Sequence, residues 1–135
     1  MRNIPGITFH KEYLDESSSW WSMSAVEQLG NIGSEVGRSI AAKKSGDIER
    51  FEGATWRMYE LFDLAMADPR WRRRGSLREI CRAREVVSDH LFGESQYGET
   101  DESLERYFLA YGIMANEERK RKRAEKKLII LGKTV

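Results

Sequence analysis

The stretch SLREICRAREVVSDHLF, residues 76–92, decides how the fold of this chain is predicted. Its apolar residues recur at helical spacing and form one face: Leu77, Ile80, Cys81, Val87 and Leu91. Ser76 followed by Glu79 has the spacing of a capping box, in which each side chain accepts from the other residue's backbone N–H. Gly93 then supplies a stop. We therefore expect a helix from Ser76 to Phe92 that begins with a capping box.

Similar patterns predict two helices before this one. The first is expected to start between Ser19 and Ser24 and to run to about Lys44, with an apolar stripe at helical spacing. The second runs from about Asp47 to Ala67, because the residue before Pro69 is pushed out of the helical region. The inner faces are expected to contain Val26, Leu29, Ile32 or Gly33, Val36 and Ile40 in the first, and Ile48, Phe51, Thr55, Met58, Phe62 and Ala65 in the second.

Glycine is frequent in the first of these helices. Gly30, Gly33 and Gly37 each cost about 1 kcal/mol relative to alanine in a helix interior. We therefore expect a neighbouring helix, or a second subunit, to approach the backbone closely at these positions.

A fourth helix is expected to begin at Thr100 or Asp101 and to continue through the charged run 117–127. Its inner stripe is predicted to be Leu104, Phe108, Tyr111 and Ile113 or Met114. Residues 70–75 form a short basic connection between the second and third helices. Four helices with short connections predict an all-α fold, an antiparallel four-helix bundle.

The length of 135 residues suits one domain with a single core. We divide the chain into an irregular N-terminal arm (1–18), the four-helix bundle (19–116), and a charged helical extension and tail (117–135). The lone Cys81 cannot form an internal disulfide, and the longest apolar run is only the four residues 128–131. We therefore expect a soluble, cytoplasmic protein with no membrane partner.

The formal net charge of +1 conceals an asymmetry between the two halves of the chain. Residues 1–68 hold 7 basic and 11 acidic side chains, whereas residues 69–135 hold 16 basic and 11 acidic ones. Two basic stretches are candidates for binding a phosphate backbone, and the alternative is a solvated surface. The first stretch mixes arginines with an aromatic ring that can stack on a base: Arg70, Trp71, Arg72, Arg73, Arg74 and Arg78. The second runs through residues 119–127.

The sequence does not contain the residue patterns that most kinds of catalytic site require. One cysteine and two distant histidines do not make a zinc site, and the spaced glycines 30–37 lack the lysine of a phosphate-binding loop. No serine, cysteine or threonine stands in a known nucleophile motif. We therefore expect neither a metal nor a cofactor.

Arg84 and His90 are the one pair that suits catalysis. Histidine can move a proton near neutral pH, and a guanidinium can stabilise a developing phosphorane charge. Six residues along a helix correspond to a rise of about 9 Å and place the two roughly 120° apart, so they converge only at an unwound helix end or across two subunits. The alternative is structural, with Arg84 paired to Glu102 or Glu105 and His90 placed favourably at its helix C-terminus.

A helical bundle of this length with Arg84 and His90 on its third helix resembles the HEPN superfamily of small helical domains. The resemblance covers roughly residues 19–116 and rests on this one motif. It implies a metal-independent ribonuclease, usually dimeric, or a catalytically silent relative that partners a nucleotidyltransferase. Arg84 then takes the family's arginine role and His90 its histidine role. Glu85 departs from the polar Asn, Asp or His frequent after the arginine and puts a negative charge beside the site.

Two other functions fit the same residues. The first is a non-enzymatic helical protein-interaction module, which predicts an apolar or glycine-rich contact surface and an Arg84 held in a structural salt bridge. The second is nucleic-acid binding without catalysis, which predicts strongly salt-dependent binding that is lost when the arginines at 72–74 are removed. In each case we expect a homodimer, with RNA or another protein as the candidate partner.

Overall fold

The computed structural model describes the backbone of residues 19–133 and all of their side chains except those at 73, 74 and 133. The predicted N-terminal arm, 1–18, lies outside the described residues. All regular elements in the described part are helical: η1 (Ser19–Ser22), α2 (Ala25–Ser45), α3 (Ile48–Ala67), α4 (Pro69–Arg74), α5 (Ser76–Phe92) and α6 (Asp101–Lys133). The predicted all-α class is confirmed.

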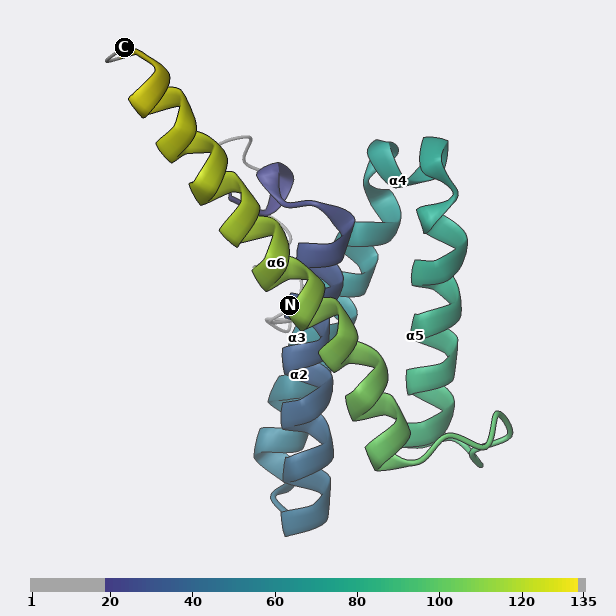
Figure 1. Ribbon diagram of the computed structural model, residues 1–135. Coiled ribbons are helices and arrows are strands. Elements are labelled where there is room, and N and C mark those ends of the chain that lie inside the picture. Colours follow the sequence, from purple (N-terminus) through teal and green to yellow (C-terminus); the bar gives the residue numbers. More distant parts are fainter. Residues whose placement is uncertain (1–18, 134–135) are drawn as a thin grey trace, which may run out of the picture.

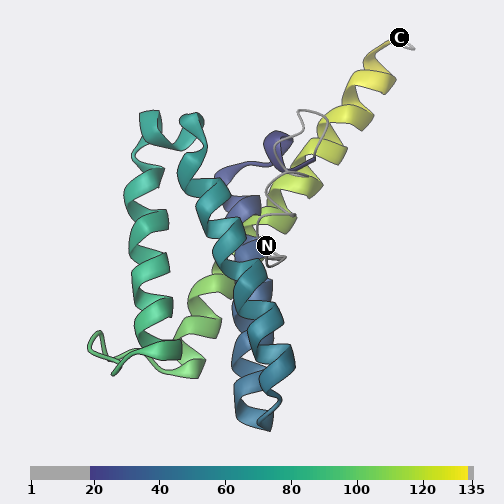
Figure 2. The ribbon, with the colours of Figure 1, turned by 180° about the vertical axis from the view of Figure 1, so that it is seen from behind.

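The helices form a body from which one end of α6 projects. α2, α3 and α5 stand side by side, while α6 crosses α2 obliquely and continues past the body to the C-terminus (Figure 1). The view from behind shows α3 on the far side of α2 from α6 (Figure 2). α2 makes its most extensive contacts with α3 and α6, so it is the central helix of the body.

The predicted helix ends agree with the structure at most positions. Asp47 caps α3 by accepting from the Arg50 backbone N–H at 3.1 Å. α3 ends at Ala67, and α5 spans the predicted 76–92. The basic connection after Asp68 is itself helical, because Pro69 suits a first helical position and the Asp68 side chain accepts from the Arg70 N–H.

The predicted capping box at Ser76 is wrong. Gly75, with φ of 78°, turns the chain directly from α4 into α5, so Ser76 is already helical and caps nothing. A capping side chain needs an extended residue just before the helix. That geometry occurs instead at Ser24, where Ser24 and Glu27 form a complete capping box at the start of α2.

The core combines the inner faces of α2, α3, α5 and the first half of α6. Ile48, at the first turn of α3, was predicted to face inward but is exposed, and so are both alternatives for the inner position of α6, Ile113 and Met114. The helical period that buries Leu104 and Phe108 continues through the partly buried Tyr111 to Ala115, so Ile113 turns outward with 54% of its surface exposed. Ala115 is the buried residue that the prediction missed.

The predicted close approach at the glycines occurs within the chain. A Cβ built on Gly33 would lie 2.6 Å from the Phe108 Cβ, and one on Gly30 would lie 3.6 Å from the Gly112 Cα. The neighbour of the glycine-lined helix is therefore α6, whose Phe108 ring needs the absence of a side chain at Gly33. Gly37 has open space around its Cα.

Candidate functional site

His90 lies where three helix ends meet. Its Nε2 is 2.6 Å from Asp101 Oδ1, which joins the last turn of α5 to the first turn of α6. From the last turn of α2, Lys44 Nζ approaches Asp101 Oδ2 at 3.6 Å and Lys43 donates to the Leu91 carbonyl at 2.7 Å. The hydrogen bond with His90 lowers the pKa of Asp101 below its usual 3.8, and Lys44 acts in the same direction.

The imidazole of His90 is largely enclosed. Its side chain is 15% exposed, and its Nδ1 is buried with no hydrogen-bond partner among the described residues. With Nε2 held by Asp101, His90 links α5 to α6. His90 thus has a structural role, as one of the two interpretations predicted, but its partner is Asp101, the first residue of α6, which sequence spacing did not indicate.

Arg84 faces α3. Its Nη2 lies 3.5 Å from Asp63 Oδ1, and its guanidinium lies 4.9 Å from the centre of the Tyr59 ring. The Tyr59 hydroxyl is in turn 2.7 Å from Ser88 Oγ. The predicted pairing with Glu102 or Glu105 is wrong, because Arg84 lies on the side of α5 that packs on α3.

Arg84 and His90 therefore have different partners on different helices. No hydrogen bond or ion pair between them occurs in the described part of the chain. Their carboxylate partners, Asp63 and Asp101, were not predicted. Both are acids on other helices, and only the packing of α3 and α6 on α5 selects them from the 22 acidic residues of the sequence.

The predicted nucleic-acid-binding residues fall into three groups. Trp71 is only 4% exposed, and its indole Nε1 donates to Gln28 Oε1 at 2.8 Å, so the ring is enclosed in the body. Arg70 is ion-paired with Asp68 at 2.7 Å and lies over the Trp71 ring. Arg72 and Arg78 are exposed, and the side chains of Arg73 and Arg74 are outside the described part.

Asp68 joins the start of α4 to α2 through its hydrogen bonds with Arg70 and Gln28. Burial raises the pKa of its carboxyl, but the hydrogen bonds from Arg70 outweigh burial and leave the pKa below its usual value. Arg70 is thus partly neutralised by a structural acid, which leaves Arg72 and Arg78 as the exposed described cations of the stretch.

A buried polar cluster lies between α2 and α3. Glu35 is buried and ion-paired with Arg38 at 2.5 Å and Arg57 at 3.1 Å, beside a cavity of about 250 Å³. Sequence reasoning missed this cluster, although Glu35 directly precedes the core residue Val36. Removing Glu35 would leave two cations without their shared acid.

A second cluster joins α5 to α6. The hydroxyls of Tyr107 and Tyr111 both donate to the Glu79 carboxylate. Burial, followed by the hydrogen bond to Glu79, raises the pKa of Tyr107. Glu79, predicted to cap its own helix, therefore fastens α6 to α5 instead.

Neither a metal cluster nor a bilayer-spanning helix is found in residues 19–133. No three or more His, Cys, Asp or Glu side chains of this range gather to hold a metal ion. None of its helices is both long and apolar enough to cross a membrane. Comparison of the chain with protein-family models, curated proteins and solved structures found no match.

Proposed function

We propose that this chain is a non-enzymatic helical interaction module that works as a homodimer through α6. The observation that carries the proposal is the set of large apolar side chains that α6 exposes: Leu109, Ile113, Met114 and Leu128–Leu131. Leu109 and Leu128 are 61% and 68% exposed. Leu109 and Ile113 are one helical turn apart, and exposed apolar side chains that lie together in this way mark protein contact surfaces.

The state of the two predicted catalytic residues supports this proposal. Arg84 is engaged by Asp63 and Tyr59, and His90 by Asp101, so both contribute to helix packing. An open groove of about 230 Å³ between α2 and α6, floored by Gly33 and Gly37, borders the exposed Leu109. In this proposal the antiparallel four-helix bundle comprises α2, α3, α5 and the first half of α6, and the cytoplasmic location stays a prediction.

A HEPN-like ribonuclease, or a silent relative, is the second candidate. It is favoured by the short contact between His90 and Asp101, because a carboxylate partner stabilises the imidazolium that forms in proton transfer. Arg84, 37% exposed, would then stabilise charge on an RNA phosphate. This candidate requires Arg84 to leave Asp63 when RNA binds.

An RNA-cleavage assay separates the two candidates. The full chain is incubated with single-stranded RNA in a metal-free buffer, alongside Arg84→Ala and His90→Ala. We expect no cleavage. Arg82→Ala is the matched control, because Arg82 is an exposed arginine of the same helix. Cleavage that is lost in the first two variants and kept in the control would establish the ribonuclease and overturn our proposal.

The interaction surface has its own test in sedimentation velocity over a concentration series. We expect Leu109→Lys combined with Ile113→Lys to weaken self-association at least about tenfold, since each change places a charge in an apolar contact. Trp56→Lys is the control, because Trp56 is an exposed aromatic residue of α3. Equal self-association of all three proteins would contradict a role for the outer face of α6.

A further inference from the structure

One stripe of α6 is exposed along most of the helix, and two of its members, Glu105 and Leu109, border the open groove between α6 and α2. Its members are spaced by three or four residues and are all exposed: Glu102, Glu105, Leu109, Ile113, Asn116, Lys120, Arg123 and Lys127. Leu104, Phe108 and Ala115 lie on the buried side, roughly 120° around the helix axis from the stripe. The stripe is therefore available to a partner without any change in the body.

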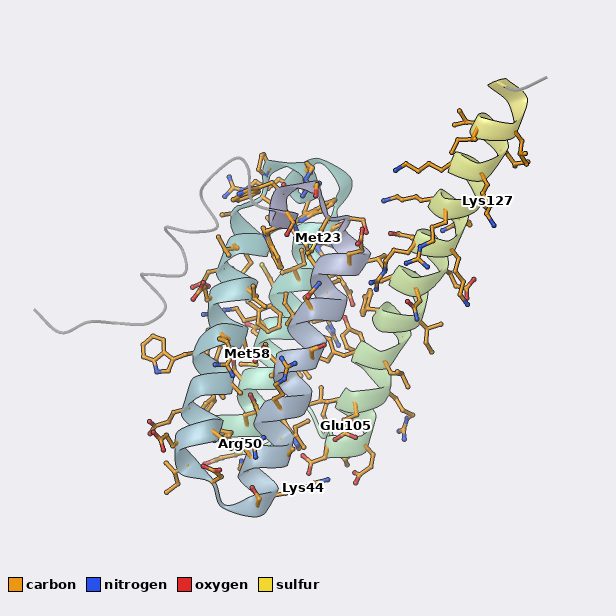
Figure 3. All side chains as sticks on the ribbon, turned by 90° about the vertical axis from the view of Figure 1, so that its left-hand side faces the viewer. Met23, Lys44, Arg50, Met58, Glu105 and Lys127 are labelled. Carbon is orange, nitrogen blue, oxygen red and sulfur yellow. The ribbon has the colours of Figure 1, made fainter. Side chains whose placement is uncertain are left out.

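The charges along this outer stripe change sign from its start to its end. It begins with two acids, continues through Leu109 and Ile113, and ends with three cations. Figure 3 shows Glu105 near the start of α6 and Lys127 on the half that stands clear of the body. A helix with this order is complementary to a second copy of itself that runs in the opposite direction.

We propose that two copies of this chain pair through antiparallel α6 helices, with a two-fold axis between Ile113 and Asn116. The inference rests on the proposed function and specifies its interface. A two-fold axis makes the interface isologous, so every contact occurs twice. Antiparallel helices also align their macrodipoles favourably.

This register pairs unlike charges at both ends. Glu102 lies opposite the partner subunit's Lys127, and Glu105 opposite the partner subunit's Arg123. Glu105 and Arg123 are 18 residues, or five full turns, apart, so they lie on the same edge of the stripe. A two-fold axis places each edge of the stripe against the same edge in the second copy. On the other edge Arg106 meets the partner subunit's Ala124, so this register places no like charges opposite each other.

The centre of the interface combines apolar and polar side chains. Leu109 contacts the aliphatic stem of the partner subunit's Lys120, and Ile113 contacts the partner subunit's Asn116 and lies near the axis. A parallel pair would instead place each acid beside its own copy and each cation beside its own copy. Like-charge pairs at those sites are destabilising.

The charged residues of the outer stripe form few ion pairs within one chain. In the described residues, Glu102, Glu105, Arg123 and Lys127 have no ion pair, and Lys120 has only an exposed contact with Glu117 at 3.9 Å. A nucleic acid or an anionic lipid surface would meet repulsion from Glu102 and Glu105. The mixed signs thus favour a second copy over a polyanion.

The same register accounts for the far end of α6. It carries Leu128 past the partner subunit's Glu102, toward the loop that includes the exposed Tyr97. Four consecutive apolar residues, 128–131, cover all sides of the helix, and such a segment is stable when it is packed. The second copy supplies that packing.

A charge-swap experiment tests the register. Sedimentation velocity is measured for the full chain, for Glu105→Arg, for Arg123→Glu and for the double variant. We expect each single change to weaken the dimer at least about tenfold and the double variant to return within about threefold of the parent. Arg121→Glu is the control, because Arg121 is an exposed cation on another side of α6 and carries the same charge change.

Carbodiimide cross-linking tests the direction of pairing. Glu102 and Lys127 are about 37 Å apart along one helix, so a cross-link between them forms only between two copies. We expect this cross-link in mass spectra of the parent and its absence from Lys127→Gln. Single changes without effect, or a dimer without the Glu102–Lys127 cross-link, would overturn the antiparallel register.

Failure of the antiparallel register can be distinguished from failure of the proposed function. If Leu109→Lys with Ile113→Lys dissociates the dimer while the charge swaps are silent, the interaction module stands and its register is wrong. A chain that stays monomeric up to about 100 µM overturns the pairing, and the RNA assay then decides separately whether the chain is an enzyme.

Discussion

The two halves of α6 differ although they form one continuous helix. From Asp101 to Glu118 it packs on α2 and is hydrogen-bonded to α5, and Leu104, Phe108 and Ala115 are buried. From Arg119 onward every described side chain is exposed, and after Lys122, whose Nζ lies 3.9 Å from Glu27 Oε1 of α2, the helix leaves the body (Figure 1). Both halves satisfy their backbone hydrogen bonds internally, so only the surroundings separate them.

The stability of the two halves of α6 has different origins. An isolated helical segment is marginal in water, and most of its stability comes from packing an apolar face. The first half has that face because Gly33 gives the Phe108 ring a place against α2. The second half has charges and an apolar end, and it depends on continuity with the first half and, as we propose, on a second copy.

The largest expected effect is a loss of stability when the buried face of the first half of α6 is changed. Phe108→Ala should lower the free energy of unfolding by about 3–5 kcal/mol, the usual cost of removing a buried aromatic ring. Ile130→Ala, in the second half, should change it by less than about 0.5 kcal/mol in dilute solution. Urea unfolding followed by circular dichroism measures both. A similar loss in the two variants would contradict the contrast between the halves.

A smaller effect sharpens the role of the glycines. Gly33→Ala should destabilise the fold by about 1–3 kcal/mol, because the new Cβ overlaps Phe108 and overpacks the crossing of α2 and α6. Gly37→Ala, one turn later with open space, should stabilise it by up to about 1 kcal/mol through helix propensity. Thermal unfolding should therefore move in opposite directions. Two shifts of the same sign would show that the close approach at Gly33 is unimportant.

The smallest effect concerns the charged start of the first half. Asp101→Asn should lower stability by about 1 kcal/mol at neutral pH, since it removes the charge that faces His90 and Lys44. The pKa of Asp101 is depressed in the folded state, so its contribution is present above the usual 3.8 and is lost as pH falls through the folded pKa.

Unfolding from pH 7 down to about pH 2 measures this contribution. The parent and Asp101→Asn should converge at the acid end, whereas Glu102→Gln, which keeps the His90 partner, should follow the parent in dilute solution. A difference that persists unchanged into acid would show that Asp101 is not stabilised by its charge.

Local patterns predicted the helices well. The 3.6-residue period located α2, α3, α5 and the start of α6, and Asp47 and Pro69 marked the ends of α3 correctly. The capping error at the start of α5 arose where two local signals competed. Ser76 has the sequence of a cap, but the left-handed Gly75 beside it made the turn tighter than a cap allows.

The candidate site could be predicted only in part. The sequence singled out Arg84 and His90, and helical spacing showed that they do not meet on one face. Their partners, Asp63 and Asp101, depend on which helix packs on which side of α5. That choice comes from long-range packing, which single-sequence periodicity does not contain.

By itself, the sequence determined the helical class, the lengths of the main helices and the charged character of the last one, because these follow from local spacing, capping residues and proline. Tertiary structure alone decided that Gly33 accommodates Phe108, that Trp71 is enclosed, and that α6 turns Ile113 outward. The physical reason is that burial belongs to pairs of surfaces. A residue's own sequence neighbourhood specifies its face of the helix, and only the packed neighbour specifies whether that face meets water.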